Sequence, residues 1–310
     1  MIATACSAAR RRRRVDLWGV LATAAMLSLA ACSSPPSTTA ESSTTSTPDA
    51  SSTLALTGAV EADASAEHVH NLALVGSDIY LGTHEGLFKQ SPGATMLRVS
   101  ADPFDVMGLT RSGNAWFASG HPGAGMEGPS DLGLITSNDG GRTWQRVSLA
   151  SEVDFHRLAA SGDTLMGTAA GTGAFMRSTD AGRTWTTLET PAPFDLAVSP
   201  KDPLLVIATT PDGPIASRDG GETFTPIASA PLIALLAWDG SGLYGVDPSG
   251  QVLVSSDDGA TWQARGTVGA APVAVTALDG TLALLAGGTV WHSRDGGKTF
   301  TPRITGLAAH

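Results

Sequence analysis

The chain has 310 residues, of which 42% are hydrophobic and 5% aromatic, and its formal net charge is −10. This length suffices for one large all-β domain or for two domains of ordinary size. An acidic surface repels phosphate backbones, so the charge argues against a nucleic acid partner, and the presence of only two cysteines excludes a framework of several disulfides.

The N-terminal segment, residues 1–31, has the pattern of a signal peptide. A run of five arginines, which ends at Arg14, is followed by an apolar stretch of 15 residues, Leu17–Ala31. This stretch is shorter than the roughly 20 residues that span a membrane. It ends in Leu-Ala-Ala-Cys, which resembles the lipobox of bacterial lipoproteins. The resemblance implies cleavage before Cys32, lipidation of its thiol and an anchor on the extracytoplasmic face of the cell membrane. The alternative is an ordinary signal peptide followed by an unmodified Cys32.

Residues 32–53 are predicted to form a disordered tether behind the lipidated cysteine. Between Ser33 and Thr53, 14 of 21 residues are Ser or Thr and three are Pro, a composition that cannot bury a core. Residues 54–67 form a lead-in segment, in which Leu54–Val60 is predicted to add a strand that helps to close the folded domain.

A motif, Ser-x-Asp-x-Gly-x-Thr followed by Trp or Phe, repeats along the remaining chain. Its five copies carry the aspartates Asp139, Asp180, Asp219, Asp257 and Asp295. The aromatic residues of successive copies are 41, 39, 38 and 38 residues apart. A degenerate copy precedes them, with Met96 in the aromatic position, 48 residues before the first aromatic residue of the series.

Each period of about 40 residues contains four short strand-like runs, which is the content of one propeller blade. Six periods over residues 68–310 therefore predict an all-β domain, a six-bladed β-propeller. With strands named A to D from the axis outward, the motif falls in the turn between strands C and D. Its aspartate is predicted to be structural, because it can accept backbone N–H groups there while the glycine supplies a positive φ.

The five motifs resemble the Asp-box, or BNR, repeats of the sialidase-like β-propeller superfamily. That superfamily includes sialidases, other glycan hydrolases, sorting receptors and photosystem assembly factors. Within it, several stretches look like those of bacterial envelope lipoproteins labelled glycosylhydrolase-like: HVHNLAL, DVMGLT, SGHPGAG, DLGLITSNDGGRTW and DFHRL. The resemblance implies the fold and does not establish an activity. True sialidase chemistry is not expected, because the two tyrosines, Tyr80 and Tyr244, fall inside predicted B strands.

Histidines and carboxylates gather at one predicted face of the ring, the face of the D–A and B–C connections. We place the starts of the A strands at Leu72, Leu109, Leu158, Leu196, Leu235 and Val275. Two positions earlier lie His70, Met107, His156, Phe194, Ile233 and Val273. Four positions earlier lie His68, Asp105, Asp154, Ala192, Pro231 and Ala271. Because residues two apart share a face of a strand, the first three blades should present polar groups at the channel mouth where the last three present apolar ones.

The B–C connections add His84 and, in the long loop from Gly120 to Asp131, His121 and Asp131. The imidazoles and this carboxylate favour binding of a ligand or of a divalent transition metal; the residues are His68, His70, His84, His121, His156 and Asp131. A carboxylate pair, Asp105 and Asp154, favours instead acid–base hydrolysis of a glycoside. The alternative to both is a hydrogen-bonded polar cluster that only seals the channel.

Three functions therefore remain open at this point. The first is a cell-envelope lipoprotein that binds a ligand or partner, such as a glycan or an envelope protein, at the His/Asp-rich channel mouth. The second is a glycoside hydrolase that uses the same face. The third is a metal-binding or metal-dependent module.

Overall fold

The computed structural model describes residues 60–61, 66, 68–190 and 192–308, and the structural statements below concern these residues. The expected signal segment, Cys32 and the tether lie outside them, as does most of the lead-in segment 54–67. Among the described residues no helix has the length and apolarity that crossing a membrane would need.

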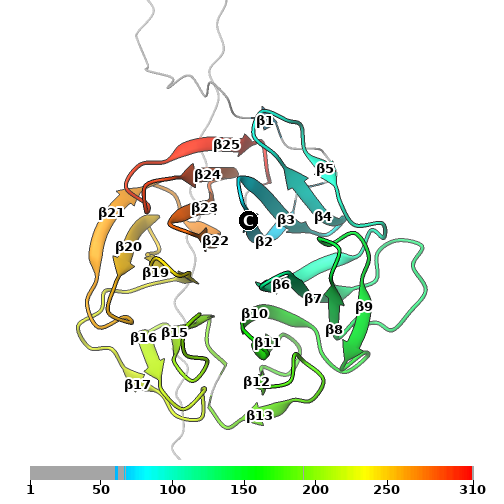
Figure 1. Cartoon of the computed structure of the whole chain (residues 1–310), viewed down its shortest axis with the longest axis horizontal. Helices are drawn as coiled ribbons and strands as arrows, with labels where there is room; N and C mark the ends of the chain where they lie inside the picture. Colours follow the sequence, from blue (N-terminus) through cyan, green and yellow to red (C-terminus); the bar gives the residue numbers. More distant parts are fainter. Residues whose placement is uncertain (1–59, 62–65, 67, 191, 309–310) are drawn as a thin grey trace, which may run out of the picture. The chain divides into compact units, whose positions relative to one another are not determined.

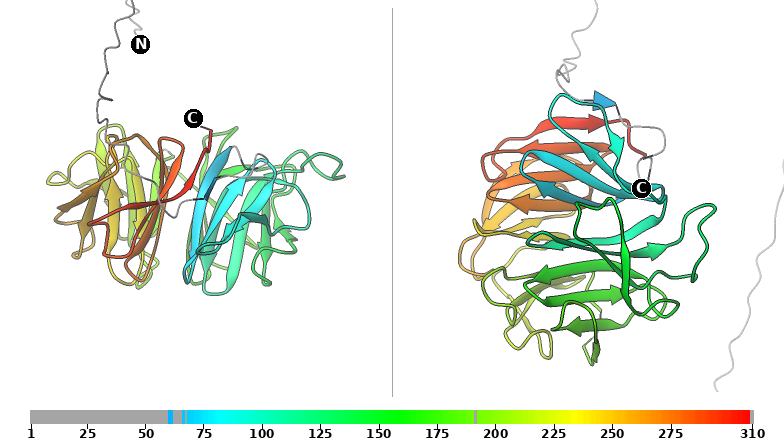
Figure 2. Two further views of the ribbon diagram at one scale, coloured as in Figure 1. Left: turned by 90° about the horizontal axis from the view of Figure 1, so that it is seen from above. Right: turned by 45° about the vertical axis from the view of Figure 1, so that its right-hand side comes forward.

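Antiparallel sheets of four strands, one for each sequence period, form a closed ring around a central channel (Figure 1). The described part of the chain contains six such sheets, so the protein is an all-β, six-bladed β-propeller, as the repeats predict. The last sheet carries one further short strand, β1 (Val60–Glu61). Seen from the side, the strands run between the two faces of the ring (Figure 2).

The strands of each blade follow the order A, B, C, D from the channel outward. The A strands are β2 (Val69–Val75), β6 (Asp105–Ser112), β10 (Phe155–Ser161), β14 (Asp195–Val198), β18 (Leu235–Trp238) and β22 (Pro272–Leu278). The B strands are β3 (Asp78–Thr83), β7 (Ala115–His121), β11 (Thr164–Ala169), β15 (Val206–Thr210), β19 (Leu243–Val246) and β23 (Thr281–Ala286). The C strands are β4 (Gly86–Gln90), β8 (Leu134–Ser137), β12 (Phe175–Ser178), β16 (Gly213–Ser217), β20 (Gln251–Ser255) and β24 (Thr289–Ser293). The D strands are β5 (Leu97–Arg98), β9 (Gln145–Ser148), β13 (Thr186–Leu188), β17 (Thr225–Pro226), β21 (Gln263–Thr267) and β25 (Thr301–Thr305).

Burial follows the position of a strand within its blade. The B strands lie inside their sheets and are covered by the neighbouring blades; every residue of β11 is buried. The D strands form the rim, and both residues of β5 and of β17 are exposed. Runs of apolar and small residues therefore form the inner strands, whereas runs rich in Thr, Gln and Arg form the outer ones.

The hydrophobic core lies largely between blades. One cluster joins Met166 of the third blade to Leu196 of the fourth, and another joins Tyr244 of the fifth to Leu284 of the sixth. The A strands of neighbouring blades contact one another around the whole ring, from β2 through β6, β10, β14, β18 and β22 back to β2. Each blade therefore relies on its neighbours to bury its two faces.

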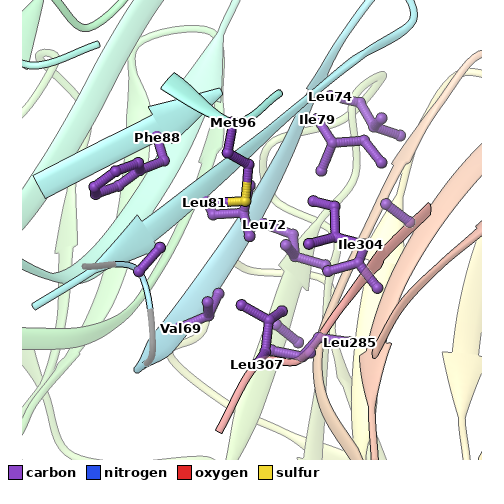
Figure 3. Packing of buried hydrophobic residues seen from close by; sticks show 14 residues of the cluster. Val69, Leu72, Leu74, Ile79, Leu81, Phe88, Met96, Leu285, Ile304 and Leu307 are labelled. Carbon is purple, nitrogen blue, oxygen red and sulfur yellow. The ribbon is translucent and has the colours of Figure 1, made fainter. Parts of the chain in front are cut away.

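The ring closes where the first blade meets the last. Leu72 of β2 and Leu285 of β23 belong to one buried cluster at this junction (Figure 3). At the outer edge of the last blade, β1 pairs in parallel with β25, with Val60 opposite Ile304. The lead-in segment thus supplies a strand to the last blade at residues 60–61.

The repeated motif forms the same turn five times between strands C and D. In the first copy, Ser137 Oγ donates to Asp139 Oδ1 at 2.8 Å and accepts from the Gly141 N–H at 2.9 Å. Asp139 accepts from Thr143, from its N–H at 3.0 Å and from its hydroxyl at 2.6 Å. The same four bonds hold the turns at Asp180, Asp219, Asp257 and Asp295. The aspartates thus serve as acceptors within the turns.

These hydrogen bonds change the acidity of the turn aspartates. The threonine N–H and hydroxyl, followed by the serine hydroxyl, favour the ionised carboxylate and lower the pKa of Asp180 and Asp219 to about 2. The same donors lower the pKa of the aspartates in the other three turns. The turn carboxylates are therefore ionised at neutral pH and are not suited to donate a proton.

The glycine of each turn faces the preceding blade. Gly141 has a φ of 85°, and a Cβ added there would overlap the side chain of Leu87 in β4. Gly182 has a φ of 82° and meets Leu134 of β8 in the same way. In these two turns the motif glycine is thus required both for the positive φ and for the close approach of two blades.

Candidate functional site

A β-bulge at the start of four A strands determines how the candidate residues are arranged. In β2, Val69 pairs with Thr83 and Asn71 pairs with Gly82, which leaves His70 as the additional residue. The additional residues in β6, β10 and β22 are Met107, His156 and Val273. A bulge interrupts the two-residue alternation of side chains, so the expected shared orientation of residues two apart does not hold across it.

The bulge also explains why the A strands begin earlier than expected. In the first three blades they start at Val69, Asp105 and Phe155, three or four residues before the leucines at which the sequence pattern placed their starts. The bulge interrupts the alternation of side chains along the strand. In the sequence, the residues before it therefore look like part of the connection between two blades and not like part of the strand. His70, Asp105 and His156 consequently lie on strands. Asp105 pairs with His121 of β7, whereas His70 and His156 are the additional residues of their bulges, between neighbours that pair with the B strands.

The first group of ligand-type side chains consists of His70, His84 and Asp105. His84 lies in the tight turn between β3 and β4, and its Nδ1 is 3.0 Å from Asp105 Oδ2. His70 Nε2 is 3.9 Å from Asp105 Oδ1. The His70 and His84 rings meet edge to face, with their centroids 4.6 Å apart. One ligand atom from each of the three residues can be chosen so that all lie within 4.8 Å of one another.

The second group consists of His121, Asp154 and His156. Asp154 is 9% exposed, and its Oδ2 is 2.6 Å from His156 Nε2 and 3.3 Å from His121 Nε2. His121 ends β7, His156 is the bulge residue of β10, and Asp154 immediately precedes β10. This group therefore joins the second blade to the third.

Two further candidates lie at the edge of these groups. His68 is exposed, and its ring centroid is 5.2 Å from that of His84. Asp131, at the end of the long B–C loop, has its Oδ1 3.4 Å from His121 Nδ1. All eight predicted site residues thus connect through contacts at one face, and we call them the His/Asp cluster: His68, His70, His84, Asp105, His121, Asp131, Asp154 and His156.

The two groups influence each other electrostatically. Burial raises the pKa of Asp105 above its ordinary value, and the charge of Asp154 raises it further, against the opposing effects of His84 and His121. Burial lowers the pKa of His121, but the Ser130 carbonyl and the nearby carboxylates together raise it above the ordinary value. Asp105 and His121 are also direct partners in the β6–β7 pairing. The cluster is therefore one coupled set of charges.

Two serines that the sequence pattern did not single out position the second group. The buried Ser119 accepts a hydrogen bond from the Phe155 N–H at 2.9 Å and so fixes the start of β10. The carbonyl of Ser130 lies 3.0 Å from His121 Nδ1. Ser119 could have been noticed as a polar residue in an apolar B strand, whereas a backbone carbonyl leaves no signal in a sequence.

The central cavity, of about 510 Å³, lies toward the opposite face. Its walls are the later residues of the A strands and the A–B turns, and none of the eight cluster residues lines it. Two of its charged residues serve the scaffold: Arg111 donates to the Leu74 carbonyl at 2.8 Å, and Asp239 accepts from the Gly280 N–H at 2.8 Å. We therefore assign the candidate site to the cluster and not to the cavity.

No protein-family model matches the sequence, and no curated protein matches it. Solved structures do match. A chain of a nidogen/laminin complex shares 13% identity at a TM-score of 0.53, over 74% of this chain and 93% of that one. The GH74 xyloglucanase from Xanthomonas campestris shares 15% identity at a TM-score of 0.50, over 79% of this chain and 46% of that one.

A third match is the extracellular domain of the putative hybrid two-component system BT4673 from B. thetaiotaomicron. It shares 13% identity at a TM-score of 0.53, over 79% of this chain and 34% of that one. The chain thus spans less than half the length of the xyloglucanase and of this extracellular domain. At such low identity, the three similarities support a common fold and leave activity undecided.

Proposed function

We propose that the protein is an extracytoplasmic lipoprotein whose propeller binds a divalent transition-metal ion at the His/Asp cluster, with His70, His84 and Asp105 as ligands. The observation that carries the proposal is the convergence of these three side chains, from separate segments of the first two blades, within 4.8 Å. Two imidazoles and one carboxylate suit zinc, copper, nickel or iron better than magnesium or calcium, which prefer oxygen ligands.

The spacing of the ligand atoms supports an ion of this class. Bonds of about 2.0–2.2 Å in tetrahedral geometry place two ligand atoms about 3.3 Å apart. Asp105 Oδ2 lies 3.0 Å from His84 Nδ1, and Asp105 Oδ1 lies 3.9 Å from His70 Nε2, one distance just below and one above this separation. Asp105 Oδ1 is buried and accepts no hydrogen bond from the described residues, so it can accept a cation. His84 is 46% exposed at its side chain, which gives an ion access from solvent.

Metal loading of purified, tag-free full chain tests this proposal. The protein is first stripped of metal with a chelator and then loaded with Zn²⁺ or Co²⁺. We expect it to retain the added ion through gel filtration. His84→Ala should weaken binding by at least ~100-fold, because it removes a direct ligand, and even indirect partners of a metal contribute 10–100-fold. Glu85→Gln, in the same turn, is the matched control and should bind normally. Folded protein that retains no ion would contradict the proposal.

Two features of the sequence support the lipoprotein part of the proposal: the N-terminal apolar stretch leads into Leu-Ala-Ala-Cys, and a Ser/Thr-rich segment follows Cys32. A lipid anchor would place the propeller in the cell envelope, where a glycan or an envelope protein is accessible to it. Labelling with a fatty-acid analogue in a bacterial host tests the anchor, and wild-type protein that takes up no more label than Cys32→Ala would rule it out.

Hydrolysis of a glycoside is a second candidate, because Asp105 and Asp154 interact and the pKa of Asp105 is raised. A carboxyl group of raised pKa together with a second carboxylate is the usual arrangement in such enzymes. The five turns resemble Asp-box repeats, and one structural neighbour is a GH74 xyloglucanase. A panel of fluorogenic glycosides tests this candidate, since activity that survives both Asp105→Asn and Asp154→Asn would exclude it.

A further inference from the structure

We infer that the metal ion of the first group takes the carboxylate of an acid with an extended apolar chain, and that Phe194 and Leu232 bind that chain. The two residues lie at the ring mouth, by which we mean the end of the channel where the D–A connections meet the A strands. This inference rests on the proposed function and names the class of ligand that the metal site takes.

Phe194 and Leu232 lie across the ring mouth from the proposed metal ligands. Each A strand contacts the next around the ring, so β14 is the third strand from β2 in either direction, and β18 is likewise the third from β6. The metal ligands His70 and Asp105 belong to β2 and β6. Phe194 immediately precedes β14, and Leu232 lies three residues before β18. A molecule bound to the ion therefore reaches this pair by crossing the mouth.

The exposure of these two side chains is not explained by the hydrophobic core. Phe194 is 61% exposed and Leu232 is 49% exposed. The residue after Leu232, Ile233, is buried in the cluster that joins the fourth blade to the fifth. This connection thus places one large apolar side chain in the core and leaves its neighbour in solvent. Sites for small molecules typically combine apolar and aromatic side chains with a few polar groups that orient the ligand.

The backbone of Phe194 is held on both sides. Its N–H donates to the Thr209 carbonyl at 2.9 Å, and its carbonyl accepts from Arg157 Nε at 3.4 Å. The Arg157 guanidinium lies 5.8 Å from the centroid of the Phe194 ring, and its Nε lies 3.7 Å from Asp195 Oδ1. Arg157 directly follows His156, so the aromatic ring borders the His/Asp cluster. A ring that is already positioned costs little to order when a ligand binds.

Charge complementarity determines the other end of the ligand. Three protein ligands leave a tetrahedral ion one open position. Because Asp105 is the one carboxylate among the three ligands, a divalent ion there keeps a net positive charge. A carboxylate neutralises this charge and supplies an oxygen ligand. The polar and apolar sides of the mouth are therefore both used by an acid whose apolar chain is long enough to reach Phe194 and Leu232.

Titration of the Co²⁺-loaded full chain with acetate, hexanoate and decanoate tests the inference, with the visible absorption of the ion and calorimetry as readouts. We expect decanoate to bind at least ~100-fold tighter than acetate, because each methylene removed from water can add about fourfold. Phe194→Ala and Leu232→Ala should each weaken decanoate binding ~10-fold more than acetate binding. Leu204→Ala is the matched control, since this 52% exposed leucine lies in an A–B turn at the other end of the ring. It should leave the preference for decanoate unchanged.

The outcomes separate this inference from the proposed function. Folded protein that does not retain Co²⁺ would refute both. Protein that retains Co²⁺ but binds the three acids with equal affinity would refute the inference and leave the metal site standing. The inference would also be wrong if the preference for decanoate survived in the double variant Phe194→Ala/Leu232→Ala, or if metal-free protein bound decanoate equally tightly. Circular dichroism and thermal unfolding establish that each variant is folded.

Discussion

The serine that opens each C–D turn makes two hydrogen bonds with one oxygen atom. These serines are Ser137, Ser178, Ser217, Ser255 and Ser293. Each serine Oγ donates to the turn aspartate and accepts from the N–H of a buried glycine. The spacing of the motif was enough to predict the turn and the role of its aspartate. It did not predict that the glycine touches the preceding blade, because that contact depends on how two repeats pack.

Ser178→Ala should test this double role. The substitution leaves the Gly182 N–H buried without its acceptor, which received the bond at 2.9 Å. An unsatisfied buried donor costs about 1–3 kcal/mol, so we expect the free energy of unfolding in urea to fall by about that amount. Ser241→Ala, at an exposed serine of an A–B turn, serves as the control and should change it by less than ~0.5 kcal/mol. Equal effects at both serines would contradict the assigned role.

The face on which the candidate residues lie could be inferred from the sequence, whereas their grouping could not. Asp105 and Asp154 stood at equivalent positions of consecutive blades and suggested a pair. The structure instead puts Asp105 with His84 and Asp154 with His156. The pairing depends on side-chain direction after a bulge, and a bulge is set by the register of two strands that are separate in the sequence.

At the level of strands, the β6–β7 pair connects the two groups of the cluster. It carries Asp105 and His121 as direct partners, and Val106 lies opposite Gly120. Gly120 has a φ of 149°, and a Cβ there would overlap the Asp105 carbonyl oxygen. A glycine is thus built into the strand end that positions both groups.

Gly120→Ala should therefore disturb both halves of the cluster. We expect a loss of about 1–3 kcal/mol in the free energy of unfolding from the strained backbone, together with weaker Zn²⁺ binding at the first group, to which Asp105 belongs. Gly171→Ala, in the corresponding connection of the next blade, is the matched control, because no atom lies within 4 Å of the added Cβ. Normal stability and normal binding in Gly120→Ala would show that this strand end does not position the cluster.

For the molecule as a whole, the repeat period predicted the number of blades and the strands of each blade. Closure of the ring was harder to predict. β1 is two residues long and pairs in parallel with a strand more than 200 positions away, and so short a strand has no distinct sequence pattern. The starts of the bulged A strands were missed for a related reason. The alternation of buried and exposed side chains is interrupted at the bulge, and the position of the bulge is set by pairing with the B strand, which the local sequence does not show.

The pH dependence of stability should reflect His292, which is 5% exposed in β24 of the closing blade. Burial, and then the charges of Arg303 and Arg294, lower its pKa to about 4 from 6.5. As pH falls from 6.5 toward 4, the unfolded chain takes up a proton that the folded protein does not. Stability that is fully present above pH 6.5 is therefore lost over this window.

The size of this effect is at most roughly 3.5 kcal/mol, at about 1.4 kcal/mol per pKa unit over about 2.5 units. The measurement is urea unfolding of chelator-treated protein at several pH values, compared with His292→Gln. The difference in unfolding free energy between wild type and variant should change between pH 6.5 and 4 in favour of the variant. A difference that stays constant with pH would show that His292 does not titrate as assigned.

The glycines of the C–D turns have one more implication. Because Gly141 touches Leu87 and Gly182 touches Leu134, every such turn is anchored in the sheet before its own. The piece that could be duplicated or excised without opening a void is consequently not one period as spelled in the sequence. It is the wedge from the middle of one sheet to the middle of the next, because a cut between two sequence periods would separate each turn glycine from the side chain that it contacts in the sheet before.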